Sequence, residues 1–266
     1  MRRYSENIIE EIASTYKFRF VVINFVITSL KQRYKKSVLG FAWVILTPML
    51  QYLIIGLVFS YTFKVKIPNY FVYMFSGSVI FNMISGVINN SPEVMFENEH
   101  YIKKIYIPKL VYILNIVFRE MVNFILGAIA LLILAIIFQK ITFSVHYFFL
   151  FIPVILCIFF LIGVSIILSV TAVYLQDLKE IIPVVMNAAY FMTPILYPLD
   201  MLPKIAHKLV LLNPFYYFVH MFRTPILKNT LPGYEFILVS IVMSFGFFML
   251  GLLMLKKFDN KIVFKL

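Results

Sequence analysis

Two rows of polar and aromatic side chains interrupt apolar stretches of the sequence and could bind a polar ligand there. Trp43, Thr47 and Gln51 are spaced four residues apart, so they share one face of a helix. The second row, which we also expect to share one face, comprises Asn187, Tyr190, Phe191, Pro194 and Tyr197. Aromatic planes stack on the C–H faces of sugars while nearby amides and hydroxyls bind sugar hydroxyls, so both rows suit a carbohydrate. Helix packing and interfacial aromatics are the alternative, which weighs more by pattern alone in a chain with 17 Tyr and 29 Phe.

A charged pair, Arg119 and Glu120, lies within the long apolar run 110–138. As a helix this run would be on the order of 43 Å long, against a hydrocarbon core of ~30 Å, so its first turns can lie at a membrane surface. Arg119 can then extend its guanidinium toward that surface. Glu120 either pairs with a basic group or is protonated, and the sequence leaves both possibilities open.

The polar segment 90–109 separates two apolar runs. Ser91 before Pro92 is typical of a helix start, and Pro108 ends the element. Acidic residues come first and basic residues last, which complements a helix dipole. The expected exposed residues are Glu93, Glu97 and His100 on a shared face, followed by Lys103 and Lys104. This helix is either simply solvated or a docking element for a partner subunit.

Motifs of enzymes and metal sites are missing from the sequence. It contains neither the G-x-x-x-x-G-K-[ST] phosphate loop nor the H-E-x-x-H zinc motif. The four histidines fall in different segments without metal-ligand spacing, and the single cysteine, Cys157, lies in an apolar run. We therefore expect no catalytic residue, no metal site and no cofactor bound by this chain. If ATP is used, another polypeptide hydrolyses it.

The composition indicates an integral membrane protein. Of the 266 residues, 62% are hydrophobic and 14% charged, and the mean hydropathy is +0.93. Soluble domains average about half apolar and a quarter charged residues. The net charge of +12 would suggest nucleic acid as a partner of a soluble protein, but membrane proteins concentrate Lys and Arg in cytoplasmic segments. We expect no nucleic-acid partner and, since the N-terminus has no apolar core, no signal peptide.

We predict an all-α fold with six membrane-spanning helices at about 38–63, 70–89, 110–138, 147–175, 181–199 and 234–255. Residues 1–36 form a cytoplasmic N-terminal region, in which 17–36 is an amphipathic helix lying in the membrane interface. A poor first spanning helix is the alternative there. The spans make one domain, 37–255, and 256–266 is a basic cytoplasmic tail. Between the last two spans, 200–212 is too short and polar to cross, so we expect short re-entrant helices.

The distribution of positive charge predicts the orientation. Most of the 24 Lys and Arg residues fall in segments that lie on the same side as the N-terminus if the six spans are correct. Because Lys and Arg accumulate in cytoplasmic segments, both termini are expected in the cytoplasm.

Three ordered stretches carry a family resemblance. They are RYKKSVLGFAW at 33–43, ENEHYIKKIYIPK at 97–109, and a series from Gly163 through Tyr174, Asp177, Thr193-Pro194, Tyr197-Pro198 and Asn213-Pro214 to Arg223. The chain resembles the membrane (permease) subunit of ABC-2 type exporters, in the branch that exports polysaccharides such as O-antigen, capsular polysaccharide or teichoic acid. Two positions depart from the family pattern, with Gln176 in place of Arg and Ile107 in place of Phe. No role for a basic group at 176 therefore carries over.

The resemblance implies a homodimeric permease in the bacterial inner (plasma) membrane that works with two copies of a separate cytoplasmic ATPase, which binds ATP and Mg. It implies export of a lipid-linked polysaccharide between the two copies, along the first and fifth spans. The path residues would be Trp43, Thr47, Gln51, Asn187, Tyr190, Phe191 and Tyr197. Residues 90–104 resemble the coupling helix that contacts the ATPase, through Glu93, Glu97, His100, Lys103 and Lys104. On charge, Arg33, Lys35 and Lys36 are candidates to contact the lipid phosphate.

Two other classes stay open. An ion-coupled secondary transporter or channel would need buried carboxylates or broken helices around an ion site, for which Glu120 is the one candidate. A membrane-embedded glycan or lipid transferase would need clustered carboxylates with a metal or phosphate site. A neighbouring gene for an ATPase with a phosphate loop would separate the exporter from both.

Overall fold

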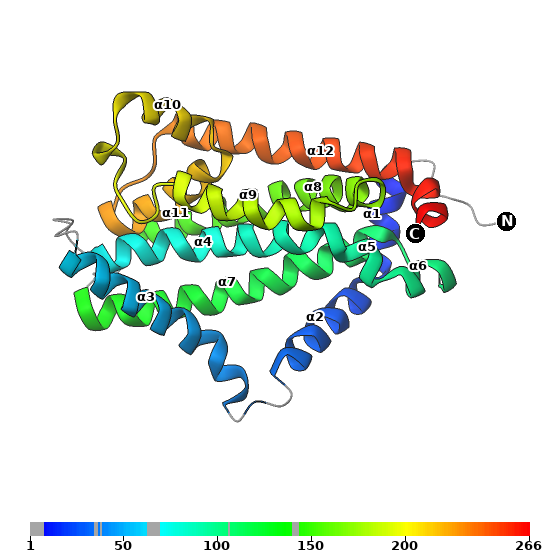
Figure 1. Ribbon diagram of the computed structural model, residues 1–266, viewed down its shortest axis with the longest axis horizontal. Coiled ribbons are helices and arrows are strands. Elements are labelled where there is room, and N and C mark those ends of the chain that lie inside the picture. Colours follow the sequence, from blue (N-terminus) through cyan, green and yellow to red (C-terminus); the bar gives the residue numbers. More distant parts are fainter. Residues whose placement is uncertain (1–7, 35–36, 38, 63–69, 106, 140–143) are drawn as a thin grey trace.

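The computed structural model describes residues 8–34, 37, 39–62, 70–105, 107–139 and 144–266 (Figure 1). Every regular element among these residues is helical. The α-helices are α1 (Ile8–Lys17), α2 (Arg19–Tyr34), α3 (Trp43–Thr62), α4 (Tyr70–Asn90), α5 (Val94–Glu97), α6 (Glu99–Lys104), α7 (Lys109–Gln139), α8 (Phe151–Tyr174), α9 (Leu178–Met192), α10 (Lys204–Leu212), α11 (Pro214–Lys228) and α12 (Tyr234–Lys265). The 3₁₀ segments are η1 (Gly40–Ala42), η2 (Ser91–Glu93), η3 (Val145–Leu150) and η4 (Leu199–Met201).

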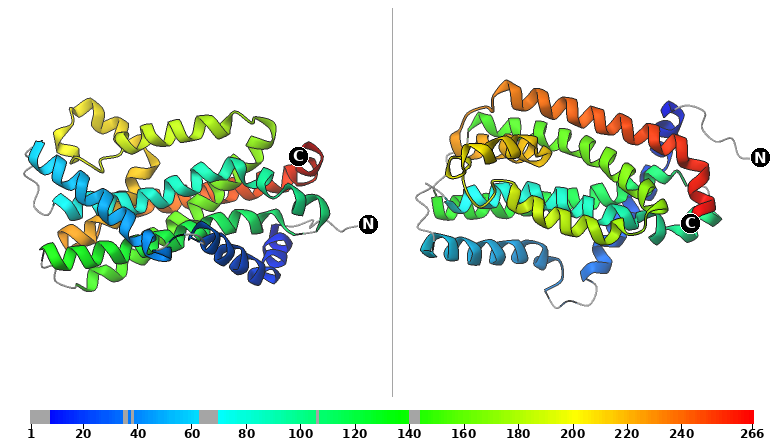
Figure 2. Two further views of the ribbon diagram at one scale, coloured as in Figure 1. Left: turned by 60° about the horizontal axis from the view of Figure 1, so that its bottom comes forward. Right: turned by 45° about the horizontal axis from the view of Figure 1, so that its top comes forward.

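Four long helices, α4, α7, α8 and α12, run along the long axis of the molecule (Figure 1, Figure 2). Each belongs to a helical stretch that is long and apolar enough to cross a membrane. A helix satisfies its backbone hydrogen bonds internally, which lipid requires of any spanning segment. The all-α class is therefore confirmed, and helices able to span are confirmed at the predicted segments 70–89, 110–138, 147–175 and 234–255.

The closest helix pair is α8 with α12, and glycine makes it possible. A Cβ atom added to Gly163 would lie 2.3 Å from the backbone carbonyl carbon of Phe247, and one added to Gly251 would lie 2.7 Å from the carbonyl oxygen of Gly163. Small residues let helix backbones approach closely in lipid, where packing replaces the hydrophobic effect between helices. This pair forms one side of the bundle, and α4 and α7 also contact α8.

The other two predicted spans are only partly matched. The segment 38–63 contains α3, which begins after the 3₁₀ turn η1, where Gly40 has a φ of +52°. The segment 181–199 is not one helix, because α9 ends at Met192 and its 15 residues are fewer than the ~20 that a straight span needs. Six spans therefore stay a prediction. The expected excursion at 200–212 corresponds to η4 and α10.

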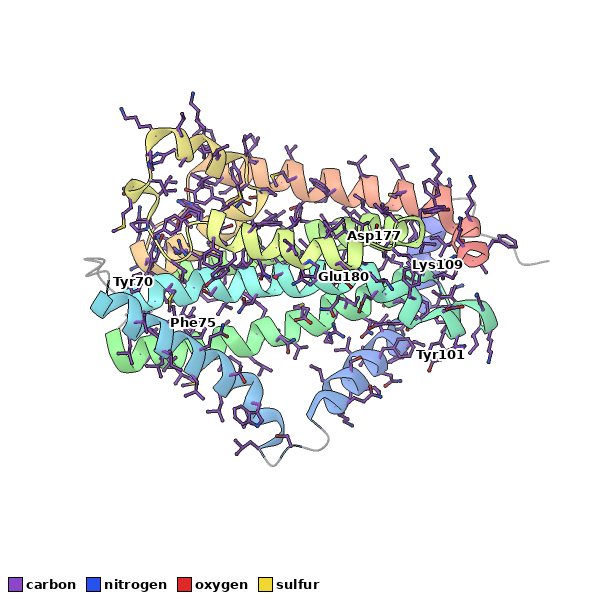
Figure 3. The ribbon with its side chains drawn as sticks, in the orientation of Figure 1. Tyr70, Phe75, Tyr101, Lys109, Asp177 and Glu180 are labelled. Atoms are coloured by element: carbon purple, nitrogen blue, oxygen red, sulfur yellow. The ribbon has the colours of Figure 1, made fainter. Side chains whose placement is uncertain are left out.

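The two ends of the bundle differ in what they carry. The C-terminus, α1, α5 and α6 lie at one end, and α10 and the start of α12 lie at the other (Figure 1). Figure 3 likewise shows Tyr101 and Lys109 at the first end and Tyr70 at the opposite end. This arrangement puts α1 and the C-terminus at the same end of the bundle, and the side of the membrane on which that end lies remains a prediction.

The predicted tail 256–266 continues α12 as a helix to Lys265. Lys109, at the start of α7, is buried, and its ammonium group donates to the carboxylate of Asp259 and, at 2.9 Å, to its carbonyl oxygen. This contact joins the start of α7 to the last turns of α12 at the first end of the bundle.

The N-terminal region contains two helices, α1 and α2. Val22 and Val26 of α2 are buried against Val111 of α7, while Phe20, Ile23 and Ile27 are exposed. The helix expected over 17–36 thus corresponds to α2, and its place in a membrane interface remains a prediction.

Candidate functional site

The first row of polar and aromatic residues lies on the exposed side of α3. Trp43, Thr47 and Gln51 all have exposed side chains. On the inner side, Met49 and Ile55 pack against the core, where α3 contacts α4 and α7. Within this chain the three residues are therefore free to face a ligand, lipid or a second protein.

The second row does not form one face, in contrast to the prediction. Asn187 and Phe191 of α9 are exposed, whereas Tyr190 turns inward, with its hydroxyl 3.4 Å from Ser78 and its ring edge-on to Phe81. Because α9 ends at Met192, Pro194 and Tyr197 lie on the following turn, and the Tyr197 hydroxyl donates to the carbonyl of Phe191. The helices that carry the two rows, α3 and α9, each pack against α4.

A buried arginine holds the turn that follows α9. Arg223 of α11 donates hydrogen bonds to the carbonyl oxygens of Pro194 (2.7 Å) and Ile195 (3.4 Å). Its guanidinium lies 3.8 Å from the ring centroid of Tyr73. Gly77 provides the space, because a Cβ there would lie 2.0 Å from a terminal nitrogen of Arg223. From the sequence, Arg223 was named as the last residue of the family-like series but was given no role, although its position among apolar neighbours was an available signal.

Tyrosines and an amide bind the same turn. The Tyr70 hydroxyl donates to the carbonyl of Leu196 (2.8 Å), and that of Tyr73 to the carbonyl of Tyr197 (2.9 Å). Asn213 donates to the hydroxyl of buried Thr193 (2.8 Å). The broken end of α9 is thus built from carbonyl groups that α4 and α11 satisfy, as non-helical backbone at membrane depth requires.

The polar segment 90–104 is divided rather than one helix. It contains η2, α5 and α6, with a break at Asn98, where φ is −104° and ψ is 13°. The break separates Glu93 and Glu97 from His100, so the predicted common helical face is wrong. All five predicted docking residues are nevertheless exposed: Glu93, Glu97, His100, Lys103 and Lys104.

Within α6 a local ion pair forms between Glu99 and Lys103, with 2.6 Å between the carboxylate and the ammonium group. The hydrogen bond from Lys103 lowers the pKa of the Glu99 carboxyl. Lys103 is therefore partly engaged, which leaves Lys104 as the cation of this segment without such a pair among the described residues.

A helical element, η2, does begin at Ser91 with Pro92 in its first turn, but the Ser91 hydroxyl does not cap it. This hydroxyl lies 2.6 Å from the carbonyl oxygen of Val87 and 2.8 Å from the hydroxyl of Ser165 on α8. The hydroxyl instead bonds back to α4 and across to α8. As a result α4 passes almost without interruption through η2 into α5, and the stretch Tyr70–Glu97 forms one long element.

The segment 90–104 also touches the start of α9. The Lys179 ammonium lies 3.8 Å from the centroid of the Phe96 ring on α5. Asp177 and Glu180, which flank this lysine, lie in the half of the molecule that carries Lys109 (Figure 3). A displacement of α5 would therefore act directly on α9, which carries part of the second row.

The predicted phosphate contacts are not tested. Lys35, Lys36 and the side chain of Arg33 lie outside the described residues.

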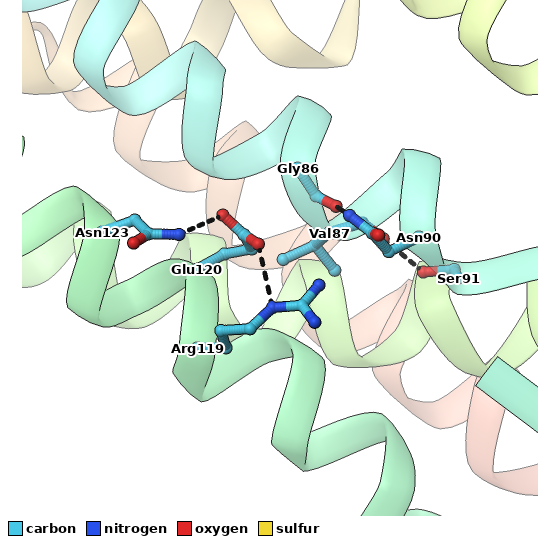
Figure 4. A network of polar contacts seen from close by, with 7 residues as sticks. All are labelled: Gly86, Val87, Asn90, Ser91, Arg119, Glu120 and Asn123. Carbon is cyan, nitrogen blue, oxygen red and sulfur yellow. Dashed lines mark hydrogen bonds and ion pairs between the residues drawn. The ribbon is translucent and has the colours of Figure 1, made fainter. Parts of the chain in front are cut away.

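The pair Arg119 and Glu120 forms a polar network on α7 (Figure 4). Arg119 Nε donates to Glu120 Oε1 (3.2 Å), and Asn123 Nδ2 donates to Glu120 Oε2 (2.9 Å). A Cβ added to Gly86 of α4 would lie 2.8 Å from Glu120 Oε2, so glycine is what admits this carboxylate. Of the two possibilities that the sequence left open, the structure supports pairing with a basic group.

A family model described as "ABC-2 type transporter" matches residues 22–227, from α2 to α11. The chain is 30% identical over 210 residues to the O-antigen export system permease protein RfbA of Klebsiella pneumoniae, covering 78% of this chain and 80% of that protein. It is 28% identical to the RfbA of Myxococcus xanthus, over 84% of this chain and 86% of that protein. The polysialic acid transport protein KpsM of Escherichia coli is 22% identical, over 77% of this chain and 79% of that protein.

Proposed function

The chain belongs to the ABC-2 type transporter family, and from this membership we propose that it is the permease subunit of an ATP-driven exporter of a lipid-linked polysaccharide in the bacterial inner membrane. The observation that carries the proposal is the similarity, along most of the chain, to permeases named for O-antigen export and polysialic acid transport. The polysaccharide would move from the cytoplasmic to the outer side. The candidate substrates are O-antigen, capsular polysaccharide and teichoic acid.

A separate cytoplasmic subunit would supply the energy. The chain has no phosphate loop, so ATP and Mg would bind to a partner ATPase present in two copies. The exposed charges of α5 and α6 support docking of that partner at the end that also carries the C-terminus. The contact between Lys179 and Phe96 would pass movement of the partner on to α9.

Two copies of the permease would enclose the path. Trp43 is 39% exposed and Phe191 64% exposed, although both are large apolar or aromatic groups. These exposed aromatic side chains, on two helices that each pack against α4, suit contact with a sugar chain or with a second copy of the permease. The domain organisation follows as 1–36, the six-span domain 37–255 and the tail 256–266.

An ion-coupled secondary transporter or channel is less well supported. Its candidate ion site is Glu120, but both carboxylate oxygens are already bonded, one to Arg119 and one to Asn123. A carboxylate held in this way is a poor ligand for a transported cation.

Co-purification tests the proposal. The chain is expressed with the phosphate-loop ATPase encoded beside it and extracted in detergent, and ATP hydrolysis is measured with and without the permease. We expect a two-plus-two complex whose hydrolysis rate depends on the permease. If no phosphate-loop partner associates, the exporter proposal fails, and ion-dependent transport by variants of Glu120 becomes the next measurement.

A further inference from the structure

A polar cavity lies between α2, α4 and α7. Its volume is about 750 Å³, and its lining includes Ser29, Gln32, Gly86, Asn90, Arg119 and Glu120, with exposed Glu97 contributed by α5. The 21 residues of α4 are on the order of 30 Å long, which matches a hydrocarbon core of ~30 Å. Gly86 and Asn90 belong to the last turn of α4, so the cavity lies near the boundary between hydrocarbon and headgroups.

Arg119 offers unused donors to this cavity. Its Nε is committed to Glu120, whereas its two terminal nitrogens have no hydrogen-bond partner in the part of the chain that the structure describes. Figure 4 shows the guanidinium turned so that these nitrogens point away from Glu120. A guanidinium fork of this kind matches two oxygens of a phosphate group.

Glu120 acts as a positioning residue for this arginine. One of its oxygens accepts from Arg119 and the other from Asn123, and Gly86 fits tightly against it. Its oxygens are thus both engaged and its charge is balanced. The orientation of Arg119 is therefore set before any ligand binds, which lowers the cost of binding.

Taking the proposed exporter function as its premise, we propose that this cavity binds the phosphate headgroup of the substrate's lipid carrier, with the terminal nitrogens of Arg119 as the anchoring donors. A free phosphate or diphosphate anion would present the same oxygen atoms to Arg119. The position beside α2 at the end of the hydrocarbon core favours the lipid, whose chain would remain in the membrane while its headgroup enters the cavity.

Glu97 opposes such a ligand. Its carboxylate contributes to the lining and would repel a phosphate. Glu97 lies on the segment proposed to contact the ATPase. Docking of the ATPase would therefore change the position of the Glu97 carboxylate and, with it, the affinity of the cavity for a phosphate. Neutralising Glu97 is therefore expected to tighten headgroup binding by about twofold, since exposed charges are screened.

The test uses the full-length protein in lipid nanodiscs and three probes: a polyprenyl diphosphate, the matching polyprenol without phosphate, and inorganic diphosphate. We expect the polyprenyl diphosphate to bind about tenfold more tightly than the polyprenol, and inorganic diphosphate to compete more weakly. Equal affinity for polyprenyl diphosphate and polyprenol would overturn the headgroup site. Inorganic diphosphate binding as tightly as the lipid would overturn the lipid as its ligand.

Variants assign the effect to Arg119. Arg119→Gln is expected to remove the preference for the diphosphate, a loss of about tenfold, and Arg119→Lys to retain part of it. Arg19→Gln is the matched control, because it removes the same charge from exposed Arg19 on α2, outside this cavity, and should change affinity by less than about twofold. Glu97→Gln should shift affinity in the opposite direction.

Replacing Arg119 alone leaves the charge of Glu120 without its positive partner. The double variant Arg119→Gln/Glu120→Gln is therefore measured together with Arg119→Gln. The double variant removes both charges and is expected to fold while still binding the diphosphate weakly. Wild-type affinity in the double variant would show that Arg119 only balances Glu120, which overturns the site.

Failure of the site and failure of the exporter are separable. One outcome is that the ATPase complex forms while Arg119→Gln and the double variant bind the diphosphate like the wild type. That result would overturn the site and leave the exporter standing. If no ATPase associates but diphosphate binding depends on Arg119, the site is supported and the exporter is overturned.

Discussion

Arg223 is a buried cation whose partners are uncharged. Among the described residues it forms no ion pair, and it is 8% exposed. Its positive charge is instead stabilised by the Tyr73 ring and by hydrogen bonds to the carbonyl oxygens of Pro194 and Ile195. The negative end of the α9 dipole lies close by, at Met192, and also favours a cation. At the residue scale, Arg223 is one of the groups that satisfy the backbone where α9 ends inside the bundle.

Replacing Arg223 is expected to loosen that turn. Arg223→Gln should lower stability by about 2 kcal/mol, because two carbonyl groups lose a charged donor in a buried position. Arg223→Lys should lose less, since it keeps the charge without the fork. Thermal unfolding of the detergent-solubilised protein measures the effect, and Arg19→Gln, at an exposed arginine, should leave Tm nearly unchanged. A Tm of Arg223→Gln equal to that of the wild type would contradict this account.

The two aromatic rows can now be separated by mutation. Trp43→Ala and Phe191→Ala should reduce export with little effect on Tm, because both side chains are exposed. Tyr190→Ala should instead lower Tm, since its ring packs edge-on against buried Phe81 and its hydroxyl lies beside Ser78. Export assays and unfolding curves on the same preparations distinguish the two effects. Normal export by both Trp43→Ala and Phe191→Ala would mean that these residues only pack.

At the scale of elements, α4 connects the two ends of the molecule. It binds the broken end of α9 through Tyr70 and Tyr73, and it continues through η2 into α5 at the other end. Since α5 touches Lys179 at the start of α9, both ends of α9 are held by the same continuous helical stretch. A shift of α5 relative to the bundle would consequently displace α9 as a whole.

The packing of α8 on α12 gives a sharp test at this scale. Gly163→Ala should destabilise the protein by about 1–3 kcal/mol, because the new methyl group would meet the backbone of Phe247 rather than a side chain that can move. Gly246→Ala, on the partner helix α12, is the control, since nothing lies within 4 Å of its added Cβ. That variant should be neutral or slightly stabilising, as alanine favours a helix. Equal unfolding temperatures for the two variants would argue against a glycine-dependent contact.

The whole molecule has two chemically different ends and an apolar surface between them. Large apolar side chains are exposed along α3, α9 and α12, among them Leu50, Val184 and Leu253. In an integral membrane protein such surfaces face lipid or another subunit. The charged α5 and α6 lie outside this apolar region, at the end that carries the C-terminus.

Charge reversal at that end should weaken binding of the ATPase. Glu93→Lys and Glu97→Lys should reduce co-purified ATPase by about tenfold, because both carboxylates are exposed and no ion pair engages them among the described residues. Glu235→Lys is the matched control, an exposed glutamate at the start of α12 on the opposite end. Unchanged co-purification with Glu97→Lys, while the permease still inserts, would count against docking at this segment.

Much of the fold could be predicted because it depends on local patterns. Apolar composition identified the membrane class, and run length located the four helices that are long and apolar enough to span a membrane. The row on α3 was also predictable, since residues four apart on any helix share a face. The row on α9 was not, because periodicity cannot say that the helix ends at Met192 or which side α4 covers.

The sequence by itself determined that this is a helical membrane protein and which residues are polar within it. Only the tertiary structure decided what those residues contact. Tyr73 reaches the carbonyl of Tyr197, Ser91 reaches Ser165, and Arg223 reaches Pro194, in each case a partner on another element. Helical periodicity specifies the direction of a side chain relative to its own axis, but not the neighbour that packing brings there. A buried polar group must find a partner, and the identity of that partner is a property of the packed bundle.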